Sequence, residues 1–564
     1  MNDLPVTLDQ LAARLKTLEH RVHVLEHRSD PPETSVGLNA TVPASPTAEA
    51  LTSTKTAGLF SVLGKAMLGI AGAYLLRAVA ESTSLPRTAV AAIAIAYAII
   101  WLVWAVRVQS DTWIPSAIYA GTSALILAPM LWELTLSFNV LTPAVAAAVL
   151  AAFVLTAAAL AWNRDLTPVW WITNLAAAVA ALALAIATRE LTPFLDVLLL
   201  MALISEYATN RNHARSVRSL PAIAADLAIL TLIFTYSGPQ TEHADYRLLD
   251  TASLLGPPCA LFIIYAGSIA IRTTLLGRTI TVFETLQTTI SFALAAFSVL
   301  SFAPQFGPIG LGVACLFISV ACYAMVLTAA RRLTVSRNCQ VFAVWATALL
   351  LAGSMLCLPG LVLVVCLGFA TIAFTLLGAC LNFVTLQVHG LVLLASAAIA
   401  SGLLDYAFHS LVGTSPLALT PSACVVALCA FVCYGAGKPA PGETWMRESL
   451  RLIPAALAAC ALAALLVGFL LHLLTLRIVP DVYHVALVRT LSTCAVALTL
   501  AFAGVRWRRP EFTRISYAAL AFVAAKLVFE DLRHGHLEFI AASICLFAVS
   551  LMIVPRLARM GQKV

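Results

Sequence analysis

Ionisable residues near the C-terminus have the spacing of a small polar site. Lys526 and Glu530 are four positions apart, which places them on one face of a helix, and Asp531 follows directly. Arg489 lies in the preceding apolar segment, where antiparallel packing brings it within reach of Glu530 or Asp531, and Glu538 opens the next segment. Our first interpretation of this cluster is a structural clamp that joins three helices. Its rival is a binding site for an anionic headgroup or solute.

Other charged residues lie within or beside apolar segments. Lys65 is a candidate charge inside the membrane, because it follows the start of the first apolar segment by about seven residues, although a lysine stem carries its ammonium group toward the surface. Six acidic residues lie near segment ends instead: Glu133, Asp196, Glu206, Asp226, Glu284 and Asp405. A charge costs least there, so we interpret most of the six as boundary residues. A proton relay would need several of them to face one cavity.

Motifs for catalysis or metal binding are absent from the sequence. It contains no glycine-rich phosphate loop, no GxSxG and no HExxH. The 13 cysteines lie almost all in apolar segments without CxxC or Cys/His metal spacing, so we interpret them as small apolar residues. We therefore predict no catalytic residue, no metal and no cofactor. Basic runs with interleaved aromatic residues are also absent, which argues against a nucleic-acid partner.

The elements that carry these residues are those of a membrane protein. Hydrophobic residues make up 61% of the sequence and charged residues only 11%, against roughly 25% charged residues in soluble proteins. The mean hydropathy is +0.94. Apolar runs long enough to cross a bilayer as helices fill residues 58–554, without the alternation of a β-barrel. We predict an all-α, polytopic bundle of about eighteen spans. The spans begin near Gly58, Ala89, Ser116, Ala144, Val169, Phe194, Ala222, Thr251, Phe283, Ile309, Gln340, Leu361, Gly390, Ser422, Leu452, Ala486, Ser516 and Leu537.

Lysine and arginine are distributed unevenly over the predicted loops. With the N-terminus in the cytosol, they gather in the loops after even-numbered spans and in the short basic tail, residues 555–564. The opposite loops carry only Arg87, Arg189, Arg247, Arg477 and Arg533. Positive residues favour the cytosolic side, so this pattern supports the span count and places both termini in the cytoplasm. The loops are too short for a catalytic domain, so any chemistry must occur at or within the bilayer.

Residues 1–28 predict a helix outside the membrane. Leucine and valine recur at spacings of four and three between positions 4 and 25, which is the a/d pattern of about three heptads. We predict a cytosolic coiled coil that pairs with a second copy or with a partner helix; the alternative is an amphipathic helix lying on the bilayer. Residues 29–57, rich in Pro, Ser, Thr and Ala, predict a flexible linker. The polar N-terminus predicts no cleavable signal peptide, so the first span acts as the insertion signal.

The two ends of the membrane region resemble a known family. The C-terminal residues that carry the resemblance are Arg489-Thr490-Leu491-Ser492, Gly504, Arg514 and Ala525-Lys526-Leu527-Val528-Phe529-Glu530-Asp531-Leu532. The N-terminal ones lie between Gly64 and Ile95 and include Leu76-Arg77-Ala78 and Pro86-Arg87. They are similar to an uncharacterised bacterial domain-of-unknown-function family of polytopic membrane proteins with an N-terminal coiled coil. This sequence departs from that family in being Ala-rich and in having Glu530 beside the aspartate. The resemblance implies an architecture and no established activity.

Many spans without an aqueous domain suit transport. The first functional hypothesis is therefore transport or handling of a lipid or solute in the bacterial inner membrane. Against it, no pair of Gly- or Pro-broken helices is recognisable at matched positions in two halves of the sequence. The second hypothesis is a non-enzymatic envelope scaffold that recruits partners through residues 4–25. A third, which we favour less, is an intramembrane transferase.

Overall fold

The computed structural model describes residues 62–75, 78, 86–107, 113–162, 166–211, 217–238, 246–331, 337–381, 383–412, 419–436, 445–477, 481–531 and 536–563. The chain divides into two compact units, Met1–Lys65 and Ala66–Val564. The predicted coiled coil and linker, residues 1–57, lie outside the described residues. The helices from α3 onward belong to the second unit.

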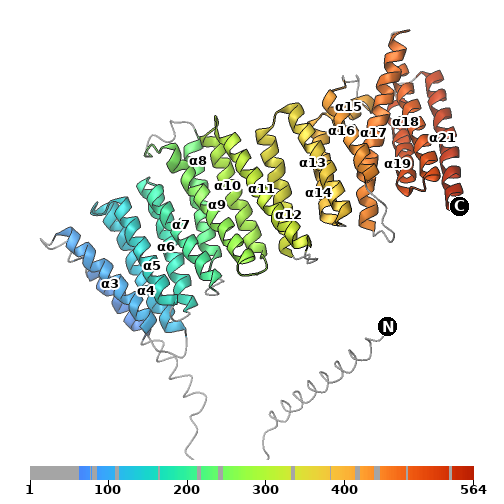
Figure 1. The fold of residues 1–564 in the computed structure, drawn as a ribbon. Helices are drawn as coiled ribbons and strands as arrows, with labels where there is room; N and C mark the ends of the chain where they lie inside the picture. Colours follow the sequence, from blue (N-terminus) through green and yellow to red (C-terminus); the bar gives the residue numbers. More distant parts are fainter. Residues whose placement is uncertain are drawn as a thin grey trace, which may run out of the picture. The chain divides into compact units, whose positions relative to one another are not determined.

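Every regular element of the described residues is a helix, which confirms the predicted all-α class (Figure 1). The short helix Val62–Leu75 comes first. It is followed by α3 (Arg87–Arg107), α4 (Ile114–Trp132), η1 (Glu133–Ser137), α5 (Pro143–Trp162), α6 (Thr167–Thr188), α7 (Thr192–Asn210), α8 (Ser219–Ser237), α9 (Thr251–Thr274), α10 (Val282–Phe302), α11 (Gly307–Arg331), α12 (Arg337–Cys357), α13 (Gly360–Cys380), α14 (Val384–Ala400), α15 (Leu403–Leu411), α16 (Pro421–Ala436), α17 (Trp445–Thr475), α18 (Val482–Arg506), α19 (Pro510–Lys526), η2 (Leu527–Asp531) and α21 (Leu537–Lys563). The predicted basic tail therefore continues the last helix.

The helices match the predicted spans one by one. Fifteen are long and apolar enough to cross a membrane, and the bent pair α14–α15 makes a sixteenth. Two shorter apolar helices, Val62–Leu75 and α16, fall where two further spans are predicted. Each of the eighteen predicted positions therefore holds a helix.

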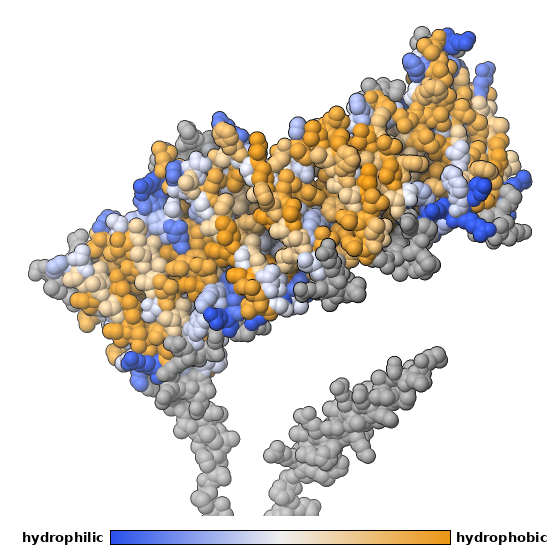
Figure 2. All heavy atoms as spheres, in the orientation of Figure 1, coloured by the Kyte–Doolittle hydropathy of each residue, from blue (hydrophilic) through white to orange (hydrophobic). Residues whose placement is uncertain are grey.

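Large apolar side chains cover the outside of the helices. Phe234, Phe317 and Phe369 are each more than two-thirds exposed. Figure 2 shows apolar residues over the middle of the helices, with hydrophilic residues gathered near their ends. Water does not tolerate so much continuous apolar surface, whereas lipid tails solvate it readily. The chain is a multi-pass membrane protein.

Glycines bring α11 and α12 together along their backbones. A Cβ atom on Gly353 would lie 2.8 Å from the carbonyl oxygen of Gly312, and a Cβ atom on Gly312 would lie 3.2 Å from that of Gly353. Helices in lipid associate largely through such close packing of small residues, because apolar side chains gain little by leaving the lipid.

One predicted span is broken. The axes of α14 and α15 differ by 64°, and Gly402 between them has a left-handed backbone (φ +73°), which favours glycine. The carbonyl oxygen of Ser401 accepts hydrogen bonds from the hydroxyls of Thr420 (3.1 Å) and Ser422 (3.1 Å). These bonds satisfy a carbonyl group at the break, as the interior of a membrane requires. It is the single bent pair among the described helices, so no matching break in a second half accompanies it.

Candidate functional site

Four consecutive helices, α7 to α10, enclose a polar interior. α7 contacts α8 and α9, and α10 contacts the same two helices, so we call the four helices the α7–α10 ring. Figure 1 shows them next to one another. Buried polar side chains come from all four helices: Ser205, Glu206 and Thr209 from α7, Asp226 from α8, Ser268 and Arg272 from α9, and Glu284, Gln287, Thr288 and Ser291 from α10. Ionisable groups within apolar helices are costly, so such a concentration marks a candidate site.

One part of the ring is an ion-pair network around Glu284. Nη1 of Arg218 lies 2.6 Å from Oε1 of Glu284, and Arg272 of α9 contacts the same carboxylate oxygen. Arg218 also donates to the hydroxyl of Thr281 (2.8 Å) and stacks over the ring of Phe283. Thr281 and Glu284 form a capping box, in which each side chain binds the backbone N–H of the other at the start of α10. Burial lowers the pKa of the Arg218 guanidinium, and the negative charge of Glu206 opposes that shift.

Glu206 is less completely bonded. Its Oε2 accepts a hydrogen bond from the hydroxyl of Ser268 (2.7 Å), and Asn210 Nδ2 donates to the same hydroxyl oxygen (3.4 Å). Oε1 of Glu206 has no hydrogen-bond partner among the described residues, and neither has the hydroxyl of Tyr265 on α9. Both residues are only 3% exposed. Buried polar atoms are nearly always bonded, so each of these two calls for an explanation.

Asp226 completes the set of acids in the ring. Its two carboxylate oxygens accept hydrogen bonds from Nε2 of Gln287 at 3.0 and 2.9 Å. Within the described residues, neither Asp226 nor Glu206 forms an ion pair, whereas both arginines contact Glu284. The ring thus holds three acids and two arginines, and two of the acids are paired with neutral donors.

Glu206, Asp226 and Glu284, which we interpreted as boundary residues, are all buried between helices. A place near a helix end does not by itself explain that burial. A signal for this was present on α10. Its polar residues recur at spacings of three and four, which predicts one polar face on an apolar helix: Glu284, Gln287, Thr288 and Ser291. By contrast, Asp196 and Asp405 are exposed near the ends of their helices, as a boundary position requires.

A polar pocket of about 310 Å³ lies at the opposite ends of α7, α8 and α9. Its wall includes two cations, Arg189 and Arg247, and the hydroxyl of Tyr236 donates to the carbonyl oxygen of Arg247 (2.7 Å). Asp250 caps α9 by accepting a hydrogen bond from the backbone N–H of Ser253 (3.3 Å). Hydrogen bonding by the side chain and then by the backbone of Ser253 lowers the pKa of the Asp250 carboxyl. The same helices therefore have a polar pocket at one end and the buried acids toward the other.

The C-terminal cluster is built on a π-helix. α19 ends at Lys526, and η2 carries the chain on to Asp531. In an α-helix, residues five positions apart point about 140° away from each other, whereas a π-turn stacks them. Accordingly Lys526 Nζ lies 2.7 Å from Oδ1 of Asp531, and it also donates to Thr490 Oγ1 (3.1 Å) and to the carbonyl oxygen of Ala486 (2.9 Å). These three bonds use all three ammonium protons.

Arg489 ties this cluster to the broken span. Its Nε donates to the carbonyl oxygen of Ser410 (2.8 Å) and its Nη2 to that of His409 (3.2 Å), at the C-terminal end of α15. Nη1 lies 3.0 Å from Oε1 of Glu530, whose Oε2 is 3.7 Å from Lys526 Nζ. A cation at a helix C-terminus meets the negative end of the helix dipole and bonds the last carbonyl groups.

Four of the six residues singled out in the sequence thus lie together: Arg489, Lys526, Glu530 and Asp531. Glu538 is exposed at the start of α21, and no hydrogen bond or ion pair within the described residues joins it to the other four. Lys65 lies in the helix Val62–Leu75 with its side chain exposed.

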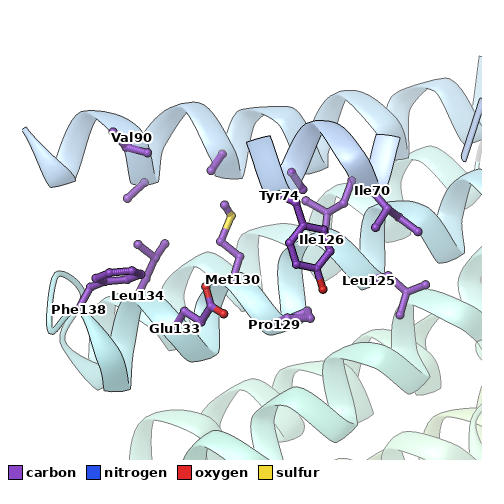
Figure 3. A pocket seen from close by; sticks show the side chains of 13 residues that line it. Ile70, Tyr74, Val90, Leu125, Ile126, Pro129, Met130, Glu133, Leu134 and Phe138 are labelled. Atoms are coloured by element: carbon purple, nitrogen blue, oxygen red, sulfur yellow. The ribbon is translucent and has the colours of Figure 1, made fainter. Parts of the chain in front are cut away.

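An apolar pocket of about 260 Å³ opens beside α3 and α4 (Figure 3). Ile70 and Tyr74 line it from one side, and Met130 and Leu134 from another. Its one carboxylate is Glu133, where α4 passes into the π-helix η1. Apart from Glu133 and the hydroxyl of Tyr74, the lining side chains are apolar, so the pocket offers space for an apolar group.

Among the residues that the structure describes, no group of three or more His, Cys, Asp or Glu side chains is placed to hold a metal ion. No family model matches the chain, and neither a curated protein nor a solved structure matches it. The function therefore has to be argued from the α7–α10 ring.

Proposed function

We propose that this multi-pass protein is a transporter of a polar solute or ion, and that its translocation route passes through the α7–α10 ring. One observation carries the proposal: Glu206 and Tyr265 are buried in the ring, and each has a polar atom without a partner among the described residues. Acids inside a membrane protein are costly and are typical of substrate and ion pathways.

A comparison between the C-terminal cluster and the α7–α10 ring supports the ring as the translocation route. In the C-terminal cluster, every donor of Lys526 is bonded and Asp531 is paired with it, which is sufficient for a structural role. In the ring, both arginines contact Glu284, and two further acids have only neutral partners among the described residues. A half-satisfied polar network is a poor way to hold helices together, because each unbonded group costs stability. A role in binding or transport explains why such groups are present.

The polar pocket at the other end of α7, α8 and α9 supports a route with two polar ends. In the orientation that the Lys and Arg pattern favours, this pocket faces outward and the three acids lie in the inner half of the bilayer. The resemblance to a bacterial membrane-protein family and the same charge pattern lead us to propose the bacterial inner membrane, with both termini in the cytoplasm.

Chemical access to the ring tests the route. Thr288 is 6% exposed and its hydroxyl has no partner among the described residues, so we choose Thr288→Cys, made in a background where the 13 native cysteines are replaced. The matched control is Thr371→Cys on α13, which is fully buried outside the ring. In proteoliposomes, we expect a small, membrane-impermeant thiol reagent to modify the Thr288→Cys variant and to leave the Thr371→Cys variant unmodified. Equal protection of the two introduced thiols would exclude an aqueous route through the ring.

The scaffold hypothesis stays a second proposal, based on the heptad spacing in residues 4–25. Deleting residues 1–28 separates it from transport. A scaffold loses partner capture on this deletion, whereas a transporter keeps the thiol accessibility of the Thr288→Cys variant.

A further inference from the structure

We propose that the ion moved through the ring is the proton, with Glu206 and Asp226 as its two carriers and the hydroxyl of Tyr265 between them. This inference rests on the proposed transport function and names the transported ion. Three features of the ring carry it: which acids have cations, what faces each acid, and where the unbonded atoms are.

The first feature is the distribution of the cations. Arg218 and Arg272 both contact Glu284, so that carboxylate has two positive partners. Among the described residues, Glu206 and Asp226 accept hydrogen bonds only from neutral groups, the hydroxyl of Ser268 and the amide of Gln287. Neither carboxylate is held in a direct ion pair among the described residues, so these two acids suit proton uptake and release.

The second feature is the surroundings of Glu206. Its charge acts on Arg218 at the start of α8 and on Tyr265 of α9. Asp226 of α8 acts on the same tyrosine, and Arg272 of α9 contacts Glu284. Glu284 adds its charge from α10. The helices α5 and α6 pack around α7 as well, and their described residues carry no ionisable side chain. Protonation of Glu206 therefore removes a negative charge that acts on groups of the ring and on no ionisable group of α5 or α6.

The third feature is the position of Tyr265. Its hydroxyl interacts electrostatically with both Glu206 and Asp226 and is hydrogen-bonded to neither. In this proposal, one water on each side of the hydroxyl completes the path. The neutral Glu206 carboxyl then loses its proton toward the hydroxyl oxygen of Tyr265, while the original hydroxyl proton passes to the Asp226 carboxylate. One O–H bond breaks and one forms at each stage, and rotation of the hydroxyl resets Tyr265. The cycle closes when Glu206 takes up a proton from water on one side and Asp226 releases its proton to water on the other.

The experiment uses the full chain in proteoliposomes that contain a pH-sensitive dye. A potassium gradient with valinomycin imposes an inside-negative potential, and the rate of internal acidification is measured. We expect the wild-type rate to exceed that of empty vesicles at least tenfold. Glu206→Gln and Asp226→Asn should each reduce it to the vesicle background, and Tyr265→Phe should reduce it severalfold. The control Asp196→Asn, an exposed acid on the same helix as Glu206, should retain the wild-type rate.

A second measurement, made on purified protein, distinguishes loss of a proton carrier from loss of flux through poor folding. Infrared difference spectra of the wild-type protein at high and low pH should contain the carbonyl band of a buried protonated carboxyl. That band should lose the Glu206 contribution and keep that of Asp226 in Glu206→Gln, wherever the variant elutes as a monodisperse species.

The outcomes separate this inference from the transport function. If the Thr288→Cys variant is modified but the wild-type protein moves no protons, the proton inference falls and the route stands. Proton movement that persists in both Glu206→Gln and Asp226→Asn overturns the choice of carriers. Acidification that requires sodium would assign the acids to a metal cation and also overturn it.

Discussion

Single side chains in the two polar clusters differ in how far their hydrogen-bonding capacity is used. Lys526 is 6% exposed and makes three bonds, and Asp531 is 4% exposed and accepts from Lys526 and Thr490. Glu206 is as deeply buried and has one carboxylate oxygen unbonded among the described residues. Burial alone therefore does not distinguish a charged side chain with a structural role from one with a role in transport. We infer that Arg489, Lys526 and Asp531 form a clamp that holds α15, α18 and η2 together.

Removing one charge from the clamp should be more harmful than removing both. Lys526→Met leaves the Asp531 carboxylate buried without its cation, which should cost about 3–5 kcal/mol of stability. The melting temperature in detergent should fall accordingly. Lys526→Met combined with Asp531→Asn should recover most of the loss, because no unpaired charge remains buried.

The same variants distinguish a clamp from a binding site. The double variant should keep the proton flux of the wild-type protein and, combined with Thr288→Cys, the same thiol accessibility in the ring. A single variant as stable as the wild type would rule out the clamp. A stable double variant that has lost flux would move the functional site to the C-terminal cluster.

At the scale of elements, close backbone contact decides where α11 and α12 pack. Gly353→Leu would push a side chain into the Gly312 carbonyl oxygen, since even a Cβ atom would lie 2.8 Å from it. Overpacking of this kind costs about 1–3 kcal/mol. We expect a lower melting temperature in detergent.

Gly310, on the helix that carries Gly312, supplies the control. A Cβ atom there would meet no atom within 4 Å, and leucine is a better helix former than glycine. Gly310→Leu should therefore leave the melting temperature unchanged or raise it. Equal losses for the two variants would show that the α11–α12 contact adds nothing to stability.

At the scale of the whole molecule, the orientation follows from the distribution of positive residues. The loop after α7 contains the positive residues Arg211 and Arg215, with Arg218 at its end. In the loop after α8, the one lysine or arginine is Arg247. We expect alkaline phosphatase, which is active only outside the cytoplasm, to be active when fused after Gly238 and inactive when fused after Arg211. Green fluorescent protein should give the reverse pattern. Reversed activities at both sites would invert the topology and place the acids of the ring in the outer half of the bilayer.

The sequence predicted those structural features whose pattern lies within a short stretch of residues. The hydropathy of a span is contained in about twenty consecutive residues, so the helices were predictable one by one. The C-terminal cluster was accessible too, because Lys526 and Glu530 lie on one helix and Arg489 lies on the helix that precedes it. The π-turn that pairs Lys526 with Asp531 left no recognisable pattern.

The α7–α10 ring could not be predicted from hydropathy and local spacing, because its polar contacts join helices that are not consecutive in the chain. Glu206 and Ser268 are 62 positions apart, and Asp226 and Gln287 are 61 apart. Hydropathy gives the existence of each helix and says nothing about which helices meet. The break at Gly402 was not predicted for a related reason. The residues of α14 and α15 together have the hydropathy of one apolar span.

The alternation of partners in the ring also has a consequence for biosynthesis. Helices leave the ribosome in chain order, yet α7 meets α9, and α8 meets α10. Asp226 therefore enters the bilayer before Gln287 has been synthesised, and an acidic residue in mid-helix costs about 2.5–3.5 kcal/mol at insertion. The insertion machinery must shelter α7 and α8 until α10 has emerged, and a nascent chain arrested before residue 282 should still be attached to it.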